Sequence, residues 1–180
     1  MSVGFLFLKL LCFLDSCESV AEAAKVIEAY FETKKSCPEM FANRDPTSSA
    51  IQQCFENQNY FYLPVTPNNY SVIYHRISNT KASNYIHDQA CKTFFMTLDS
   101  CIYTQGPRSG LIILFDMKNI GLSHMTRPKM QHLKIFFRYL QDALPAKLKE
   151  IHILNAVSFF DVLLAMVKPF MKADIFNKVS

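Results

Sequence analysis

Long apolar runs alternate along this chain with helical patterns, and the most marked run lies between Gly110 and Asp116. Its residues 111–115 are all large and apolar. A strand that faced water on one side would alternate apolar and polar positions, so this run predicts a strand buried on both faces. A second run, 151–154, follows a helical pattern that begins near Arg127. The resulting β-α-β unit predicts two parallel strands in an α/β fold.

Two further strands and a covering helix are expected before this unit. Residues 60–63 are typical of a short extended segment, and residues 71–77 of the first long strand. A helix that starts near Asn84 has one apolar face and should cover the sheet. The helix of the β-α-β unit should begin at a Thr126 cap and end at Pro145. Its predicted buried stripe is Met130, Leu133, Phe136, Phe137 and Leu140.

The N-terminal third is predicted to be helical. Ser19 is a candidate helix cap, and Glu22 completes a capping box for an amphipathic helix that extends to Lys35. The preceding segment Val3–Leu14 is apolar but too short to span a bilayer. It fits either a helix or the core of a signal peptide. Lys9 interrupts the apolar run and no basic residue precedes it, which favours the helix.

Two more helices complete the pattern. A short helix is expected over residues 51–57, after the turn signals around Pro46. The last helix should begin near Ser158 and be bent or closed by Pro169. Its apolar set is broad enough to face both a core and a movable partner: Phe159, Phe160, Val162, Leu163, Met166, Val167 and Phe170.

Composition narrows the class of protein. The 180 residues, half of them hydrophobic, are enough for one domain with a real core and too few for two ordinary ones. Sixteen Phe and eight Met suit either a core or an apolar cavity. The net charge of +4 suits an anionic surface and lies far below the basic excess typical of histones. Charge alone does not choose between a membrane and a nucleic acid; the family resemblance described below implies no nucleic-acid partner.

The sequence contains no pattern typical of a metal site, a cofactor-binding site or a catalytic centre. Its six cysteines form no Cys-x-x-Cys pair and have no histidine at zinc spacing, so they are expected to be reduced structural thiols. Four glycines hardly suffice for a phosphate loop or a dinucleotide fingerprint. Ser109 lies one position late for a nucleophile elbow. Asp116 and His124 are candidates for an acid-base pair. The favoured interpretation is that Asp116 forms a turn at the end of the strand and that His124 is a surface residue in the following loop.

An ordered series of motifs resembles one known family. It consists of Gly110, Phe115–Met117, Gly121, Ser123–His124, Leu140–Pro145, Lys147–Asn155, Phe159–Phe160 and Met166–Met171. This series is similar to the CRAL-TRIO, or Sec14-like, lipid-binding domains, and within them to the branch with α-tocopherol transfer protein and clavesin.

The resemblance implies a particular organisation. Residues 1–58 would form an N-terminal helical subdomain, and residues 59–180 an incomplete CRAL-TRIO-like domain with a mixed, mainly parallel sheet flanked by helices. The family would continue beyond Ser180 through a further strand and a C-terminal region. On this view the chain is truncated, and an absent edge strand would leave backbone groups unpaired.

The resemblance also implies a non-enzymatic carrier of one lipophilic molecule, such as a tocopherol, a retinoid or a phospholipid acyl chain. The carrier would act in the cytoplasm and associate peripherally with membranes. The same side chains fit ordinary packing of helix on sheet equally well. The candidate pocket residues are Phe94, Thr97, Leu98, Phe136, Tyr139, Leu140, Leu144, Ile151 and Phe160.

In tocopherol-transfer-like members a basic cluster grips a phosphoinositide headgroup. By resemblance those positions fall on Lys34, Lys147, Lys149 and Lys178, whereas one further position falls on Asp174 and reverses the charge. Lys147 and Lys149 alternate before the strand at 151–154, so an extended backbone would direct both to the same side. A solvated basic face remains the alternative for this pair.

Two other functions stay open at this point. A chain with an incomplete sheet fits a non-binding interaction module, in which an exposed helix contacts another protein. If residues 3–14 are a signal peptide, the chain would instead be a secreted lipid binder.

Overall fold

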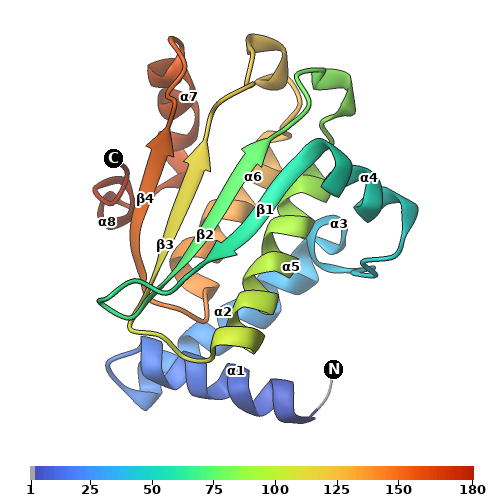
Figure 1. Cartoon of the computed structure of the whole chain (residues 1–180). Coiled ribbons are helices and arrows are strands. Elements are labelled where there is room, and N and C mark those ends of the chain that lie inside the picture. Colours follow the sequence, from blue (N-terminus) through green and yellow to red (C-terminus); the bar gives the residue numbers. More distant parts are fainter. Residues whose placement is uncertain (1–2) are drawn as a thin grey trace.

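The computed structural model describes residues 3–180 and builds them around one four-stranded sheet (Figure 1). Its strands lie in the order β1 (Gln58–Leu63), β2 (Tyr70–Ile77), β3 (Gly110–Asp116) and β4 (Leu148–Leu154). β1 is antiparallel to β2, whereas β2, β3 and β4 are parallel to one another. The sheet is therefore mixed and mainly parallel, and the predicted parallel pairing of β3 with β4 is confirmed.

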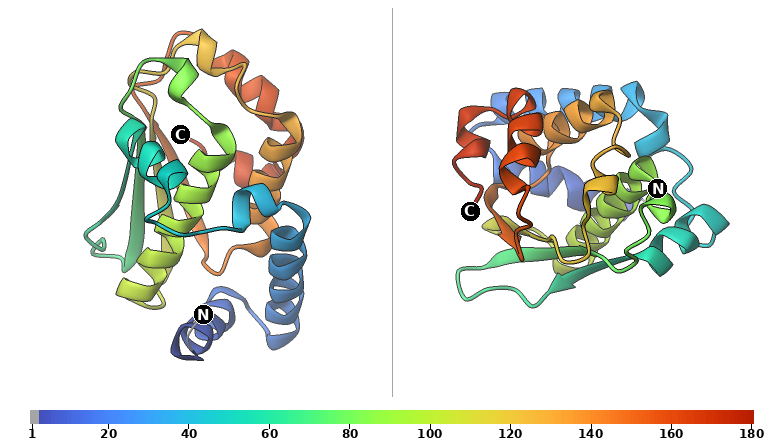
Figure 2. Two further views of the ribbon diagram at one scale, coloured as in Figure 1. Left: turned by 90° about the vertical axis from the view of Figure 1, so that its right-hand side faces the viewer. Right: turned by 90° about the horizontal axis from the view of Figure 1, so that it is seen from above.

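Helices cover one face of this sheet, as the view from above in Figure 2 shows. α5 (His87–Gln105) connects β2 to β3, and α6 (Met130–Arg138), extended by the π-helical turn η3 (Tyr139–Ala143), connects β3 to β4. Within residues 3–180 no helix lies on the opposite face (Figure 2). Right-handed crossovers of this kind place their helices against the sheet, where the apolar faces of both are buried.

The N-terminal helices pack on the outer side of α5 and η3. They are α1 (Val3–Ser16), α2 (Val20–Ser36), α3 (Pro38–Phe41) and α4 (Ser49–Asn57), so the helix expected over the first residues is confirmed. Ser19 caps α2, because its hydroxyl accepts a hydrogen bond from the Glu22 amide at 3.1 Å. The carboxylate of Glu22 accepts from the Glu18 amide at 2.7 Å, one residue before the position of a standard capping box.

The start of α6 differs from the sequence prediction. Thr126 does not cap this helix, because its hydroxyl donates to the Ser123 carbonyl at 3.0 Å in the preceding turn. The helix begins at Met130, after Lys129, which makes no side-chain capping bond. A short 3-10 turn, η2 (Leu122–His124), uses the residues that a longer helix would have needed.

An aromatic cluster holds the helical layers together. The ring of Phe95 on α5 lies 4.8 Å from that of Phe41 on α3 and 4.5 Å from that of Tyr139 on η3, measured between centroids. Phe136 of α6 lies 5.4 Å from Phe95 on the same basis. All four rings are buried. The cluster therefore joins the N-terminal helices to the layer that covers the sheet.

The C-terminal segment returns to the edge of the sheet. α7 (Phe160–Val167) is followed by the turn η4 (Lys168–Phe170), by α8 (Ala173–Phe176) and by an extended stretch. The amide of Ile151 donates to the Lys178 carbonyl at 2.8 Å, and the Ile153 amide donates to the Ser180 carbonyl at 2.8 Å. The outer edge of β4 is thus partly paired, in parallel register, where an unpaired edge was expected.

Two features of the described residues bear on chemistry and targeting. Each of the six cysteines is a free thiol, and five of them are buried. No helix within residues 3–180 has both the length and the apolar character that crossing a membrane requires.

Candidate functional site

An apolar cleft of about 270 Å3 lies between the helix-covered face of the sheet and α7. Successive side chains of a strand point to opposite faces, so Ile151 and Ile153 of β4 reach the same side and form part of its floor. α7 and the residues that follow it supply the roof. The apolar lining comprises Ile77, Phe115, Met117, Ile120, Phe137, Ile151, Ile153, Phe160, Leu163, Leu164, Val167, Met171 and Val179.

The roof helix is loosely held. No residue of α7 is fully buried, although its apolar side chains Leu163, Leu164 and Val167 are half-buried over the cleft. Val162 lies outside the cleft and is 58% exposed. Because its apolar side chains are only partly buried, α7 is held to the sheet less firmly than α5 and α6, which each contain several fully buried residues.

Polar groups in the cleft already have partners. The imidazole of His75 lies 3.0 Å from the side-chain oxygen of Gln58 and stacks on the Tyr60 ring at 4.7 Å between centroids. Burial lowers the pKa of His75 from 6.5 to about 4, so the ring is neutral at pH 7. The Tyr85 hydroxyl lies 2.9 Å from Nδ1 of His87. Apart from the carboxylate of Asp116, the cleft therefore offers a neutral, mainly apolar surface.

Asp116 ends β3 and organises the turn that follows it. Its carboxylate accepts hydrogen bonds from the Tyr74 hydroxyl at 2.6 Å, the Asn155 amide at 2.8 Å and the Lys118 backbone amide at 2.9 Å. Burial favours the neutral carboxyl, but these hydrogen bonds outweigh it and hold the pKa of Asp116 below its ordinary value. The predicted role as a turn former is confirmed.

His124 is buried, so its prediction as a surface residue is wrong. Its Nδ1 accepts a hydrogen bond from the Gly121 amide at 3.1 Å and thereby closes the η2 turn. The hydrogen bonds of Asp116 and His124 go to other groups, so the two do not form an acid-base pair.

Lys149 occupies an unusual position on β4. The register shifts between Leu111 and Ile112 of β3, which pair with Leu148 and Glu150, so Lys149 is the extra residue of a β-bulge. The bulge breaks the simple alternation expected for Lys147 and Lys149. The side chain of Lys149 lies over Gly110, where an added Cβ would be 2.4 Å from its Cγ. Its ammonium nitrogen is 5.4 Å from the centre of the Tyr70 ring.

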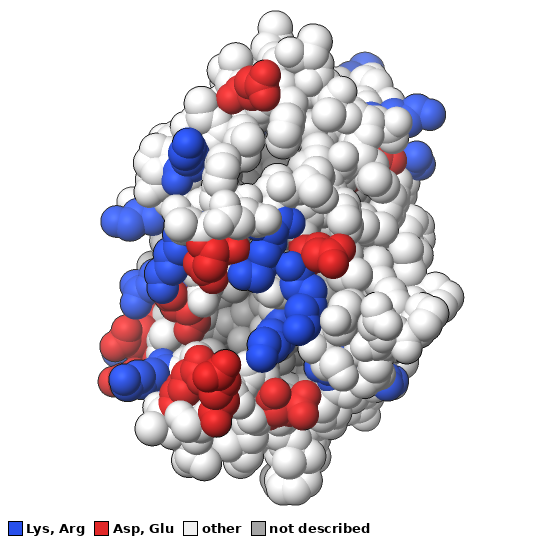
Figure 3. Space-filling model, turned by 90° about the vertical axis from the view of Figure 1, so that its left-hand side faces the viewer, with Lys and Arg blue, Asp and Glu red and all other residues white. Residues whose placement is uncertain are grey.

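The other candidate lysines have separate surroundings. The side chain of Lys147 is exposed. The ammonium nitrogen of Lys178 lies 3.5 Å from a carboxylate oxygen of Asp174. Figure 3, which views the molecule from the β4 side, shows basic and acidic side chains interspersed around a hollow. Lys34 donates to the Tyr30 hydroxyl at 2.8 Å, and burial lowers the pKa of Lys34 to about 8. Its charged neighbours are Asp99, Lys9 and Arg44.

Comparison with known protein families identifies the domain to which this cleft belongs. Residues 55–180 match the family model described as the CRAL/TRIO domain, which is more than half of the chain. The chain is a member of the CRAL/TRIO family. The resemblance found in the sequence motifs is thereby confirmed.

Relatives of this CRAL/TRIO chain include three proteins named alpha-tocopherol transfer protein-like. Those of Pongo abelii and Homo sapiens are each 28% identical over 158 residues, and that of Mus musculus is 29% identical over 158 residues. The match covers 87% of this chain and 46% of each relative. The chain therefore spans about half the length of the curated relatives that it matches.

A solved structure supports the fold independently. The crystal structure of Sfh5 superposes with a TM-score of 0.62 at 9% identity, and the match covers 90% of this chain and 60% of Sfh5. At this level of identity the likeness concerns the fold alone. The mixed α/β architecture predicted for a CRAL/TRIO domain is confirmed.

The residues predicted for the CRAL/TRIO pocket fall into three places. Ile151 and Phe160 line the cleft. Thr97 lines a different hollow, of about 460 Å3, between α5 and β1. The other six are buried members of the hydrophobic core: Phe94, Leu98, Phe136, Tyr139, Leu140 and Leu144. Contact of any of these residues with a ligand stays a prediction.

Sequence reasoning did not select most of the side chains around the cleft. Phe115 and Ile153 belong to strands that were predicted to be buried, but the strand pattern does not show which buried side chains border a cavity. Leu163 and Val167 were part of the broad apolar face predicted for the last helix. The breadth of this apolar face was the available signal for a cavity. A helix that covers a cavity has a wider apolar face than a helix that only packs against a sheet.

Proposed function

We propose that this chain binds one small lipophilic molecule in the cleft beneath α7 and acts as a carrier without catalysing a reaction. The observation that carries the proposal is an apolar cleft roofed by a helix that has no fully buried side chain. Burial of a few hundred Å2 of apolar ligand contributes several kcal/mol at about 25 cal/mol per Å2. The names of the tocopherol-transfer-like relatives point to the same ligand class.

The size of the cleft bears on how a ligand enters. Its volume of about 270 Å3 is slightly below the usual range of small-molecule pockets, which begins near roughly 300 Å3. A molecule as large as a tocopherol therefore requires α7 to move outward. The ligand would then contact Leu163, Leu164 and Val167, the half-buried side chains that face the cleft.

Titration with a fluorescent tocopherol analogue tests the carrier proposal. Leu163→Trp should fill the cleft and weaken binding by at least about tenfold, or roughly 1.4 kcal/mol. Val162→Trp is the matched control, because it adds the same ring to the exposed side of the same helix. Native mass spectrometry should detect one ligand per chain. The absence of binding by the wild type, or an equal loss in both variants, would refute the proposal.

We also propose that Lys147, Lys149 and Lys178 assist docking to membranes that contain phosphoinositides. Backbone pairing of β4 with residues 178–180 brings Lys178 beside the strand that contains Lys149 and that Lys147 immediately precedes. Ammonium groups that converge on one polyvalent phosphate form charge-assisted hydrogen bonds. Lys34 was assigned to the same cluster by resemblance, and its partners Tyr30 and Asp99 support a structural role instead.

Vesicle co-sedimentation at low and high salt tests the docking proposal. Simultaneous replacement of Lys147 and Lys149 by Ala should weaken binding to vesicles containing phosphatidylinositol bisphosphate and leave uptake of the tocopherol analogue intact. Binding should also fall as salt rises, because exposed charges are screened. Lys81→Ala combined with Lys118→Ala is the control, since both side chains are exposed and belong to other segments. If the wild type and the double variant bind the vesicles equally at low salt, Lys147 and Lys149 have no part in docking.

A further inference from the structure

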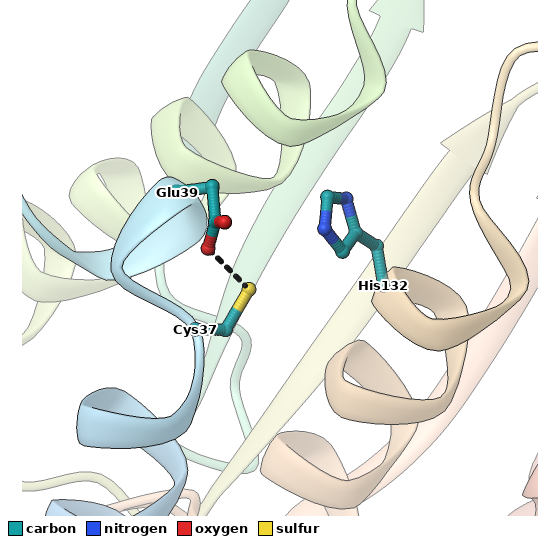
Figure 4. A group of neighbouring side chains, drawn as sticks. All are labelled: Cys37, Glu39 and His132. Carbon is teal, nitrogen blue, oxygen red and sulfur yellow. Dashed lines mark hydrogen bonds between the residues drawn. The ribbon is translucent and has the colours of Figure 1, made fainter.

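Three potential metal ligands meet where the N-terminal helices face the sheet-covering layer (Figure 4). Cys37 lies at the junction of α2 and α3, Glu39 is in α3, and His132 is in α6. The sulfur of Cys37, a carboxylate oxygen of Glu39 and a ring nitrogen of His132 all lie within 4.8 Å of one another. Figure 4 shows the three side chains directed toward a common point.

The spacing of the first two ligands matches metal coordination. The Cys37 thiol donates a hydrogen bond to Oε2 of Glu39 over a sulfur–oxygen distance of 3.5 Å. In a tetrahedral zinc site, a sulfur at about 2.3 Å and an oxygen at about 2.0–2.2 Å from the metal are roughly 3.5 Å apart. These two ligands therefore need little movement, and a small shift of the His132 side chain would complete a three-ligand face.

We propose that Cys37, Glu39 and His132 bind one divalent transition-metal ion, zinc by preference, with water as the fourth ligand. Thiolate and imidazole ligands select zinc over magnesium and calcium, which require oxygen ligands. On binding, a sulfur lone pair forms the bond to the ion and the thiol proton leaves to solvent. No electron is transferred, so no co-reactant is needed.

The surroundings support a site that an ion can reach. Cys37 is 2% exposed and His132 is 7% exposed, whereas Glu39 is exposed and leaves an entry path for the ion and its water. The His132 ring stacks on the buried ring of His87 at an interplanar angle of 16°, which restrains its orientation. Of the nearby charges, Lys129 opposes a cation and Asp88 favours one.

His132 also has unused hydrogen-bonding capacity. Neither of its ring nitrogens makes a hydrogen bond within residues 3–180, and Nδ1 is fully buried. The ring nitrogen that faces Cys37 is therefore available to coordinate an ion (Figure 4). Burial raises the pKa of the Cys37 thiol, so the ion has to displace a firmly held proton.

The site would act as a clamp between two parts of the fold. Cys37 and Glu39 belong to the N-terminal helices, and His132 belongs to the helix between β3 and β4. An ion held by all three joins segments that are distant in the sequence, and it stabilises the folded chain because the unfolded chain lacks the site. The expectation of no metal site rested on local spacing, which does not report ligands brought together by tertiary contacts.

Titration of the full chain with Co2+ under reducing conditions tests the site, because a thiolate ligand produces a sulfur-to-cobalt charge-transfer band. One equivalent of Co2+ should produce that band, Zn2+ should abolish it by displacement, and Zn2+ should raise the melting temperature. Cys37→Ser should remove the band, and His132→Ala should remove or strongly weaken it. Cys101→Ser is the control, since Cys101 is as deeply buried as Cys37 but lies on α5, which carries none of the three ligands.

Glu39→Gln keeps the test decisive if Cys37→Ser fails to fold, because Glu39 is exposed and its replacement disturbs no packing. This variant should weaken Zn2+ binding at least tenfold in calorimetry while circular dichroism of the metal-free chain stays unchanged. The proposal is overturned if the folded wild type gives no thiolate band. It is also overturned if Glu39→Gln and wild type bind Zn2+ equally.

Discussion

The ammonium nitrogen of Lys9 on α1 lies 2.7 Å from a carboxylate oxygen of Asp99 on α5. Arg44 binds the second oxygen of the same carboxylate at 2.6 Å, and Lys9 also donates to the Tyr30 hydroxyl at 2.7 Å. All of these groups are at least partly buried. The first helix is therefore fastened to the rest of the chain by a charge network as well as by apolar packing.

Replacing Asp99 by Asn should destabilise the fold strongly. The change leaves the cations of Lys9 and Arg44 in a largely buried place without their counter-charge, which costs about 3–5 kcal/mol. Urea unfolding followed by circular dichroism measures this loss. Asp161→Asn is the control, because Asp161 is exposed on α7 and its replacement should change stability by less than roughly 0.5 kcal/mol. Similar losses in both variants would contradict the role of the network.

His75 should make the fold sensitive to acid. Its folded pKa of about 4 lies below the ordinary 6.5, so its contribution to stability is complete above pH 6.5 and is lost as the pH falls toward 4. A shift of this size corresponds to roughly 3 kcal/mol. The groups that face the ring are Gln58, Tyr60, Phe115 and, at longer range, Asp116.

Unfolding experiments at a series of pH values measure this effect. His75→Phe keeps an aromatic ring against Tyr60 but cannot be protonated, so it should lose less stability than the wild type between pH 6.5 and pH 4. Other buried groups contribute equally to the pH dependence of both proteins. The contribution of His75 to stability is therefore the difference between the two curves. Parallel curves for the two proteins would show that this histidine does not set the acid response.

The aromatic cluster should be the most costly part of the core to disrupt. Phe95 is 1% exposed and contacts the rings of Phe41, Tyr139 and Phe136. Phe95→Ala should therefore reduce the free energy of unfolding by about 3–5 kcal/mol. Phe31→Ala is the matched comparison, because Phe31 is 57% exposed. Chemical denaturation of the two variants decides whether the cluster carries this stability.

Gly110 should control the position of Lys149. A methyl group added at Gly110 would lie 2.4 Å from Cγ of Lys149 and 3.0 Å from Cδ1 of Tyr70, so the lysine side chain has to move away. Gly110→Ala should weaken phosphoinositide-vesicle binding in the same direction as the loss of Lys149, with a stability loss of only about 1–3 kcal/mol.

Gly4→Ala supplies the comparison for that experiment, because nothing lies within 4 Å of the added carbon. This second variant should leave vesicle binding unchanged. Unaltered binding by folded Gly110→Ala would show that the placement of Lys149 over Gly110 has no part in docking.

Local patterns in the sequence determined the elements of this fold. Residues 111–115 and 151–154 form parallel strands as expected, and Ser19 caps its helix, because side-chain periodicity and capping depend on residues near in the chain. The family, too, was recognisable from motifs in the order in which they occur. These features need no knowledge of which distant segments meet.

Tertiary structure alone decided how the side chains were grouped. It buried His124 and set Lys34 among the charges of Asp99, Lys9 and Arg44. It also brought Cys37 to His132 and formed the cleft beneath α7. Each outcome depends on contacts between segments far apart in the chain, and the burial and electrostatic energies that fix them exist only when those segments pack together.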